Sequence, residues 1–277
     1  MDTGQLLTLR KMNLPNQTTV LHVSDTHLSP EFPASSEMWT AAVRYVEKSR
    51  PDLVIHTGDV VHDDPDSDGD YEFAAFQMRR LTAAWRIVPG NHDIGDSEPD
   101  PYRGLISHER LARFRRHFGA DRWSVAIGGW LLIGLNSLLF DNHLAAEEAE
   151  QWDWLAERLR EADGRPVGLF MHKPPAINSL DENLHVNKSI GVESRARLLA
   201  LAESGAVKLI GSGHLHEHVV LFSRGTLLVG APALGPVTAG AATWNLGLRC
   251  NGLVEYRFSG ATVRVRLLRE EELGIGR

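Results

Sequence analysis

Apolar and polar positions along the first hundred residues predict strands and helices in turn. Short apolar runs of strand length end in polar residues at Asp25, at Gly58-Asp59 and at Pro89-Gly90. Two stretches with helical spacing lie between them. Such a succession is typical of βαβ units with a parallel sheet. The predicted strands are Thr19–Ser24, Leu53–Thr57 and Trp85–Val88, and the predicted helices are Ser36–Ser49 and Tyr71–Ala84.

The rest of the chain is richer in predicted strands. Trp123–Ile127 and Trp130–Asn136 flank two glycines and read as a hairpin. A strongly amphipathic helix follows, with Trp152, Leu155 and Leu159 on its apolar side. The pattern predicts this helix over Leu144–Ala162. After it, the pattern predicts the strand Val167–Met171, the helix Glu193–Ser204, the strand Val207–Ile210 and short strands over residues 219–268. No repeat or linker interrupts the chain, so we expect a single domain over residues 1–277 that includes the segment 219–268.

Side chains of the kinds that bind metals follow five of the predicted strands. Taken alone, a Gly-Asp turn or a histidine after a strand is commonly structural, so the prediction depends on the whole set. Parallel strands end at one edge of their sheet, and we therefore expect these side chains to converge. The positions are Asp25-Thr26-His27, Gly58-Asp59, Gly90-Asn91-His92-Asp93, His172 and Gly213-His214-Leu215-His216.

Convergence of three carboxylates, five imidazoles and one carboxamide calls for cations. Crowded carboxylates repel one another, and partly buried ones are poorly solvated. Divalent cations would offset that cost. Imidazole nitrogen together with carboxylate oxygen suits Zn, Mn or Fe better than Mg or Ca, which prefer oxygen ligands. Gly58, Gly90 and Gly213 are expected to let the backbone turn tightly beside the ions.

Composition narrows the class of protein. The 277 residues include 29 Lys and Arg against 36 Asp and Glu, a net charge of −7, so a surface attractive to nucleic acid is not expected. The one cysteine, Cys250, permits neither a disulfide framework nor a thiolate metal site. No signal peptide or membrane-spanning run is recognised, and we expect a cytoplasmic protein without a membrane partner.

The set of motifs from residue 25 to residue 216 resembles the calcineurin-like metallophosphoesterase superfamily. Within it, the chain looks most like the bacterial class III cyclic-nucleotide and glycerophosphodiester phosphodiesterases. The resemblance implies an α/β fold in which a two-sheet β-sandwich is flanked by helices in four layers. It also implies two metal ions, Fe, Mn or Zn, bridged by Asp59. One ion would be held by Asp25, His27, Asp59 and His216, and the other by Asp59, Asn91, His172 and His214.

The resemblance also implies a mechanism. The two ions would share a hydroxide that attacks phosphorus in line. His92 has no metal role in the family pattern. We expect it to face the substrate as the catalytic residue, where it either stabilises the transition state or protonates the leaving oxygen. Asp93 is expected to support the turn or orient a ligand.

Two positions depart from the family's patterns. Many phosphoprotein phosphatases have an aspartate three residues after the bridging one, paired with the catalytic histidine, and here that position is His62. A protein-phosphatase role is therefore less favoured. Many of the phosphodiesterases have a second histidine where this chain has Lys173. We expect that lysine to be solvated, with contact to a substrate phosphate as the alternative.

The leading hypothesis is hydrolysis of a small soluble phosphodiester, of the cyclic-nucleotide or glycerophosphodiester type. A phosphomonoesterase with the same site is the alternative, and a non-catalytic metal-binding scaffold is an alternative of another class. A nuclease is disfavoured by the negative net charge. A homo-oligomer is left open.

The remaining charged and histidine positions receive structural interpretations. His22 and His56 lie within predicted strands and are expected in the core. The arginine-rich segment 110–116 and the acidic segment 63–70 are both expected to be solvated. His185 and Asn187 are candidates for the lining of the pocket. Surface or supporting roles are expected for the histidines His108, His117, His143 and His218.

Overall fold

A computed structural model describes residues 17–62, 64–184, 186–236 and 246–275. Among these residues, two sheets form, with five and seven strands. The first has the order β12-β11-β1-β2-β3 and the second β10-β8-β9-β7-β6-β5-β4. The strands of the first sheet are β1 (Thr18–Val23), β2 (Leu53–His56), β3 (Trp85–Ile87), β11 (Gly252–Ser259) and β12 (Thr262–Arg269). Those of the second are β4 (Trp123–Ile127), β5 (Trp130–Gly134), β6 (Val167–Met171), β7 (Val207–Ser212), β8 (Glu217–Ser223), β9 (Thr226–Gly230) and β10 (Leu248–Arg249).

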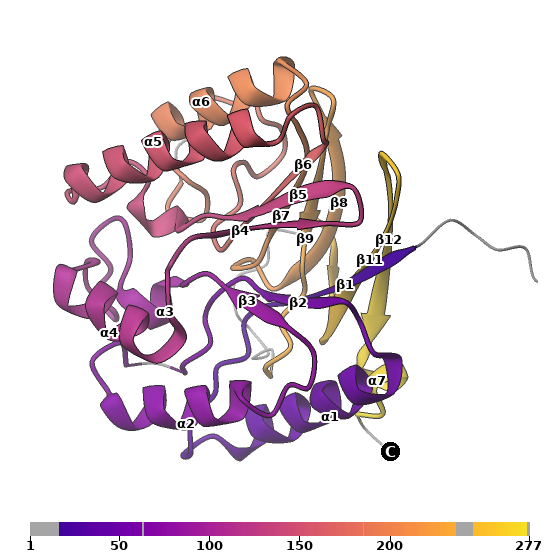
Figure 1. The fold of residues 1–277 in the computed structure, drawn as a ribbon. Helices are drawn as coiled ribbons and strands as arrows, with labels where there is room; N and C mark the ends of the chain where they lie inside the picture. The colour runs from indigo at the N-terminus through magenta and orange to yellow at the C-terminus, as the bar shows by residue number, and fades with distance from the viewer. Residues whose placement is uncertain (1–16, 63, 185, 237–245, 276–277) are drawn as a thin grey trace, which may run out of the picture.

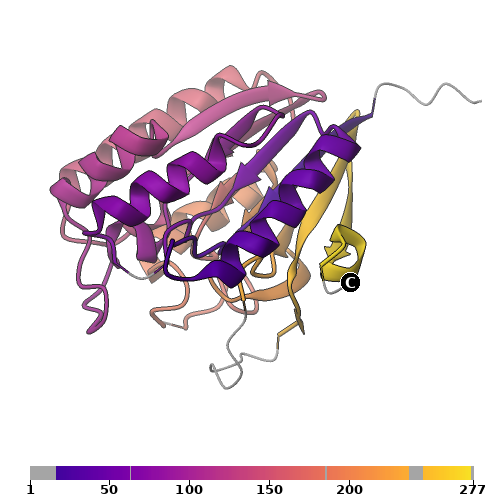
Figure 2. The same cartoon turned by 90° about the horizontal axis from the view of Figure 1, so that it is seen from below.

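Helices cover the outer face of each sheet, which gives four layers (Figure 1). On one side, α1 and α2 run next to each other over the first sheet (Figure 2), and α5 and α6 cover the second. The predicted fold, a two-sheet sandwich flanked by helices, is confirmed. The helices are α1 (Pro33–Ser49), α2 (Asp68–Met78), α3 (Asn91–Ile94), α4 (His108–Phe118), the 3-10 turn η1 (Ser137–Leu139), α5 (Ala145–Glu161), α6 (Val192–Glu203) and α7 (Glu270–Leu273).

Apolar side chains fill the three spaces between the layers. Val20, Ile55, Leu132, Phe170 and Leu209 are among the buried residues between the two sheets. A second cluster lies between the first sheet and α1, α2 and α4, and a third packs α5 and α6 on the second sheet. These contacts fix the two sheets face to face, since buried apolar surface is the main favourable contribution to folding.

Most predicted elements exist, with shifted ends. The helix expected from Tyr71 begins at Asp68, because Ser67 caps it by accepting from the amide of Asp70 at 3.2 Å. The hairpin β4–β5 turns at the two glycines as predicted. In α5, Trp152 and Leu155 are buried and Leu159 is partly buried against the same cluster. The pattern gave no account of the short helix α3.

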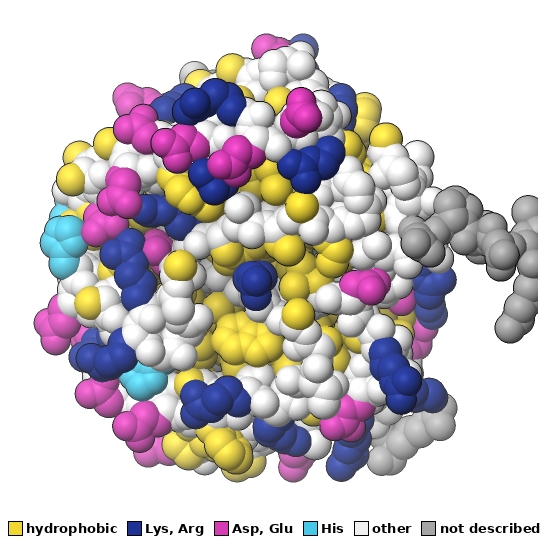
Figure 3. Space-filling view, viewed as in Figure 1, with side chains coloured by type: hydrophobic (Ala, Val, Ile, Leu, Met, Phe, Trp, Pro, Cys, Tyr) yellow, Lys and Arg dark blue, Asp and Glu magenta, His cyan; other side chains and the backbone are white. Residues whose placement is uncertain are grey.

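Two arginines of segment 110–116 pair with aspartates of the acidic segment, which corrects the expectation that these arginines are simply solvated. Arg110 lies 2.6 Å from Asp66, and Arg113 lies 2.9 Å from Asp68. Both acidic side chains remain more than half exposed, so each pair contributes little stability. On the face shown in Figure 3, basic and acidic side chains are interspersed rather than gathered into one basic patch. Within the part of the chain that the structure describes, no helix has the length and apolar content needed to cross a membrane.

Candidate metal centre

The predicted ligands come from the carboxyl ends of five strands in two sheets. Strands β1, β2 and β3 are parallel in the first sheet, and β6 and β7 are parallel in the second. The segment that follows each strand carries one or two of the side chains. In chain order, these segments supply Asp25 and His27, Asp59, Asn91, His172, and His214 and His216. The sequence placed these residues at one sheet edge, whereas the structure gathers them from the facing edges of two sheets.

Five of these seven residues have a left-handed backbone conformation. Their φ angles lie between 48° and 68°, a region that non-glycine residues rarely adopt. The list is Asp25, His27, Asp59, His214 and His216. Amide donors hold the first turns together, since the N–H of Asp25 donates to the carbonyl of Gly58 and that of His27 to the carbonyl of Asp59, each at 3.0 Å. Such local strain is typical of functional sites.

The three glycines of the motifs act in two different ways. Gly58 has a φ of +94°, so it turns the backbone as expected. The backbone also turns at Gly90 and Gly213, whose carbonyls accept from the amides of Asp93 at 3.1 Å and Leu215 at 2.8 Å, but neither glycine has a positive φ. A Cβ at Gly90 would collide with the carboxylate of Asp59, and one at Gly213 with the hydroxyl of Ser24. These two glycines permit close approach of the backbone to neighbouring side chains.

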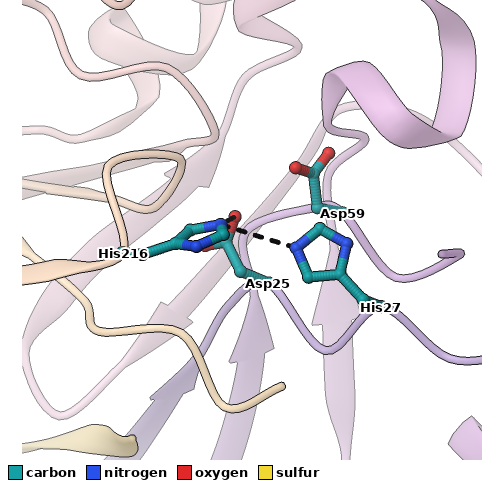
Figure 4. A group of neighbouring side chains, drawn as sticks. All are labelled: Asp25, His27, Asp59 and His216. Atoms are coloured by element: carbon teal, nitrogen blue, oxygen red, sulfur yellow. Dashed lines mark hydrogen bonds and ion pairs between the residues drawn. The ribbon is translucent and has the colours of Figure 1, made fainter. Parts of the chain in front are cut away.

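The first ligand group consists of Asp25, His27, Asp59 and His216, one atom from each lying within 4.8 Å of the others. Figure 4 shows the side chains of Asp25, His27 and His216 close together, with Asp59 beside them. The Nε2 atoms of His27 and His216 face each other at 3.4 Å, and Asp25 Oδ1 lies 3.1 Å from His216 Nε2. Within the described residues, His27 Nδ1 is buried without a hydrogen-bond partner.

The second group consists of Asp59, His172 and His214, again within 4.8 Å. The carbonyl of Thr57 accepts from His172 Nδ1 at 2.8 Å, which fixes the proton of a neutral ring on that nitrogen. The lone pair of Nε2 then faces Asn91 Oδ1 at 3.0 Å and Asp59 Oδ2 at 3.4 Å. With the ring neutral, these three acceptor atoms face one another, and a metal cation would take the place of the proton that the metal-free ring binds on Nε2. The donor set of both groups therefore fits two metal ions that share Asp59.

The electrostatics of the centre favour cations. Burial raises the pKa of Asp25, but the positive charge of His216 outweighs it and lowers the pKa to about 2. Asp59 has its pKa lowered well below the usual range because His172 and His92 outweigh burial in the same way. Conversely, burial lowers the pKa of His172, while Asp59 and Asp25 raise it to about 9. Two ionised buried carboxylates thus attract positive charge to this point.

His92 lies beside the first ligand group. Its ring centroid is 4.5 Å from that of His27, and its Nε2 atom is 3.7 Å from Asp59 Oδ2. The backbone carbonyl of His62 accepts a hydrogen bond from Nδ1, so Nε2 faces the centre. His62, three residues after the shared Asp59, therefore orients His92 through a backbone oxygen, where many phosphoprotein phosphatases use a carboxylate side chain. Burial lowers the pKa of His92 to about 4.

Asp93 supports the two turns, as one of its expected roles required. Its Oδ2 atom accepts from the amides of Asp59 and Gly90 at 2.9 and 2.8 Å. Its Oδ1 atom accepts from the amides of Val60 and Val61 at 2.9 and 3.0 Å. The carboxylate thereby fixes the backbone on both sides of the bridging residue.

Lys173 is buried, and the expectation of a solvated side chain is wrong. Its ammonium group lies 2.5 Å from Asp96 Oδ1 and 2.6 Å from Asn187 Oδ1. Asp96 and Ser97 were not singled out from the sequence, because they follow α3 in a segment with no motif. The structure thus gives Asn187 a partner, while His185 lies outside the described residues.

The histidines outside the two ligand groups include two in the core, as expected. His22 and His56 are fully buried. His22 Nε2 lies 2.8 Å from the hydroxyl of Thr57, and His56 Nε2 lies 2.9 Å from that of Thr26, so both support the loops that carry ligands. Neither ligand group includes His108, His117, His143 or His218.

Comparison with known proteins identifies the class to which this fold and site belong. The chain belongs to the calcineurin-like phosphoesterase family, whose model matches residues 18–218. Human serine/threonine-protein phosphatase CPPED1 is 27% identical over 199 residues, which are 65% of this chain and 61% of the human protein. The similarity therefore spans about three fifths of that relative.

Two bacterial relatives are matched over more of their length. A probable glycerophosphodiester phosphodiesterase, GpdQ, from Arcobacter nitrofigilis is 25% identical over 229 residues, 81% of this chain and 76% of that protein. The 3',5'-cyclic adenosine monophosphate phosphodiesterase CpdA of Escherichia coli K12 is 26% identical over 225 residues, 77% and 75% of the two chains. A dimetal phosphatase from Danio rerio shares the fold, with a TM-score of 0.65 at 11% identity over 90% of this chain and 95% of that chain.

Proposed function

We propose that this chain is a dinuclear metal-dependent phosphoesterase that hydrolyses a small phosphodiester. The observation that carries the proposal is the pair of ligand groups that share Asp59. Asp25, His27 and His216 would complete the site of one ion. Asn91, His172 and His214 would complete that of the other. Mn, Fe and Zn are the candidate metals, because the donors are imidazole nitrogen and oxygen.

When bound, two such ions supply positive charge for the phosphate oxygens and acidify a water for attack on phosphorus. The chain's own part is to hold the ligand side chains in fixed positions. Asp59 and Asp93 fix the two turns around the centre. His92, held through its Nδ1 proton, presents Nε2 toward the place where the substrate would lie. With a second proton, taken up from water onto Nε2, it would stabilise developing charge or protonate the leaving oxygen.

A phosphodiester is favoured over a monoester by the two bacterial relatives, both of which are named as diesterases. A phosphomonoesterase is the second candidate, because the human relative is named as a protein phosphatase. The side chain of His62 weighs against that second candidate, since it replaces the aspartate found in many phosphoprotein phosphatases. Nucleic acid is not a proposed substrate, because the net charge is −7 and the arginines of α4 are paired with carboxylates.

The test is hydrolysis of two aryl esters by metal-depleted protein before and after addition of Mn²⁺. We expect Mn²⁺ to restore hydrolysis of bis-p-nitrophenyl phosphate, with p-nitrophenyl phosphate turned over more slowly. The Asp59→Asn variant, which lacks the shared ligand, should lose at least about 100-fold in activity. Preference for the monoester would support the second candidate. Failure of Mn²⁺, Fe²⁺ and Zn²⁺ to produce hydrolysis of either ester would leave only a non-catalytic scaffold.

A further inference from the structure

Lys173 forms a buried polar cluster directly behind the candidate metal centre. Its side chain is fully buried, and that of Asp96 is 3% exposed. The ammonium group has three acceptors, at 2.5 Å on Asp96, 2.6 Å on Asn187 and 3.1 Å on Ser97. All three N–H bonds of the ammonium are therefore used within the protein, and none is left for substrate.

This cluster links the same two segments that meet in the second ligand group. Asn91 and His172 approach at 3.0 Å within the centre, and Asp96 and Lys173 pair outside it. Segment 91–96 is thus attached to residues 172–173 at both of its ends. The amide of Lys173 also donates to the hydroxyl of Ser137 at 2.8 Å. The backbone of Asp96 donates to Gly104 at 2.9 Å and accepts from Ile106 at 2.8 Å. The backbones of Lys173 and Asp96 are therefore both held in place.

Taking two charges out of water is costly, and a buried ion pair commonly contributes no net stability compared with apolar residues. The location of this one indicates a different use. We propose that Lys173 and Asp96 are positioning residues, which hold Asn91 and His172 at the separation that the second ion requires. The inference rests on the proposed function, since it presumes a metal at that site. Loss of comparable supporting contacts weakens metal binding by about 10- to 100-fold.

The experiment measures Mn²⁺ binding by equilibrium dialysis of metal-depleted protein, so it needs no turnover. The variant Lys173→Met removes the ammonium group and leaves Asp96 as a lone buried charge. If that variant fails to fold, the double variant Lys173→Met with Asp96→Asn is used, because it removes both charges. Each change is made in two backgrounds. His216→Ala removes a ligand of the first group only, and His214→Ala removes one of the second group only.

We expect wild-type protein to bind two Mn²⁺ per chain. In the His216→Ala background, where the second site remains, Lys173→Met should lower the affinity for Mn²⁺ by about 10- to 100-fold. In the His214→Ala background, where the first site remains, Lys173→Met should leave the affinity for Mn²⁺ unchanged. Arg115→Met is the matched control, because Arg115 pairs with buried Asp121 at 2.9 Å and contacts none of the ligands. It should leave both ions bound as in the wild type.

Two results would overturn the inference. One is folded Lys173→Met protein, judged by thermal unfolding, that binds both ions with wild-type affinity. The other is equal weakening in the two backgrounds, which indicates a general loss of structure. Wild-type protein that binds two Mn²⁺ but hydrolyses neither ester contradicts the proposed function and leaves this inference standing. Wild-type protein that binds fewer than two ions contradicts both.

Discussion

Five of the seven candidate ligands occupy left-handed backbone, at a conformational cost of roughly 1–2 kcal/mol each. The surrounding hydrogen bonds offset this cost. They include the pairs that join the turns after β1 and β2 and the four amides that bind Asp93. The strain directs side chains from separate strands to one point. At the residue scale, substitution of a candidate ligand would remove a donor from the centre without relieving the backbone strain.

His92 offers a test at the same scale. If Nε2 protonates the leaving oxygen, His92→Asn should slow esters with poor leaving groups more than aryl esters, by about 100-fold or more for an alkyl ester. Metal loading should be unchanged, because His92 belongs to neither ligand group. Turnover of Mn²⁺-loaded enzyme is compared for bis-p-nitrophenyl phosphate and an alkyl diester. An equal loss on both esters would assign His92 to charge stabilisation instead.

At the scale of elements, the short helix α3 connects the turns that follow β2 and β3. It holds Asn91, His92 and Asp93 in consecutive positions, each with a different partner. Asn91 contacts His172, the amide of His92 donates to Asp59, and Asp93 binds the turns. A helix of four residues has little stability of its own. Its place is therefore set by these contacts and by the buried pair of Lys173 with Asp96.

Replacing Asp93 should destabilise this junction strongly. In Asp93→Asn, one side-chain oxygen becomes an amide nitrogen, and two buried N–H groups lose their acceptor at about 1–3 kcal/mol each. We expect the free energy of unfolding of metal-depleted protein, measured in urea, to fall by roughly 2–6 kcal/mol. The control is Asp153→Asn on the exposed side of α5, which should change it by less than about 0.5 kcal/mol. A fall no larger than that of the control would show that the four amide contacts do not support the turns.

For the whole molecule, the important feature is that the metal centre draws on both sheets. Asp25, Asp59 and Asn91 follow strands of the first sheet, whereas His172 and His214 follow strands of the second. The apolar layer between the sheets therefore controls the distance between the two halves of the site. Buried histidines on both faces of the first sheet connect overall stability to pH.

We expect acid to destabilise the metal-depleted protein through these histidines. Burial lowers the pKa of His22 and that of His56 to about 3, against about 6.5 in the unfolded chain. The unfolded state then binds more protons, so stability that is present above about pH 6.5 is lost as the pH falls toward 3. Each histidine contributes a slope of up to about 1.4 kcal/mol per pH unit.

Urea unfolding at several pH values between about 6.5 and 4.5 checks this expectation. His22→Gln should remove one titrating group and reduce the slope by up to about 1.4 kcal/mol per pH unit, with the full effect at the acid end of this range. His108→Gln, whose parent side chain is 71% exposed, should leave the slope as it is. Equal slopes for wild type and His22→Gln would contradict the role assigned to burial.

The sequence by itself determined which residues form the candidate centre. Asp25, Asp59, Asn91 and His172 each follow an apolar run of strand length, and that local pattern does not depend on how the sheets pack. The resemblance of the motif set to a known family added the sandwich and the sharing of Asp59. Helix and strand positions followed from periodicity, because an apolar face must be buried whatever its partner.

Only the tertiary structure decided how the centre is supported. The buried state of Lys173 depends on Asp96 and Asn187, which are 77 and 14 residues away in sequence. The role of Gly90 depends on the carboxylate of Asp59 in another loop. His62 orients His92 through a backbone oxygen, which every residue type possesses and no sequence pattern distinguishes. Contacts between distant segments decide burial and charge pairing, and local patterns do not contain them.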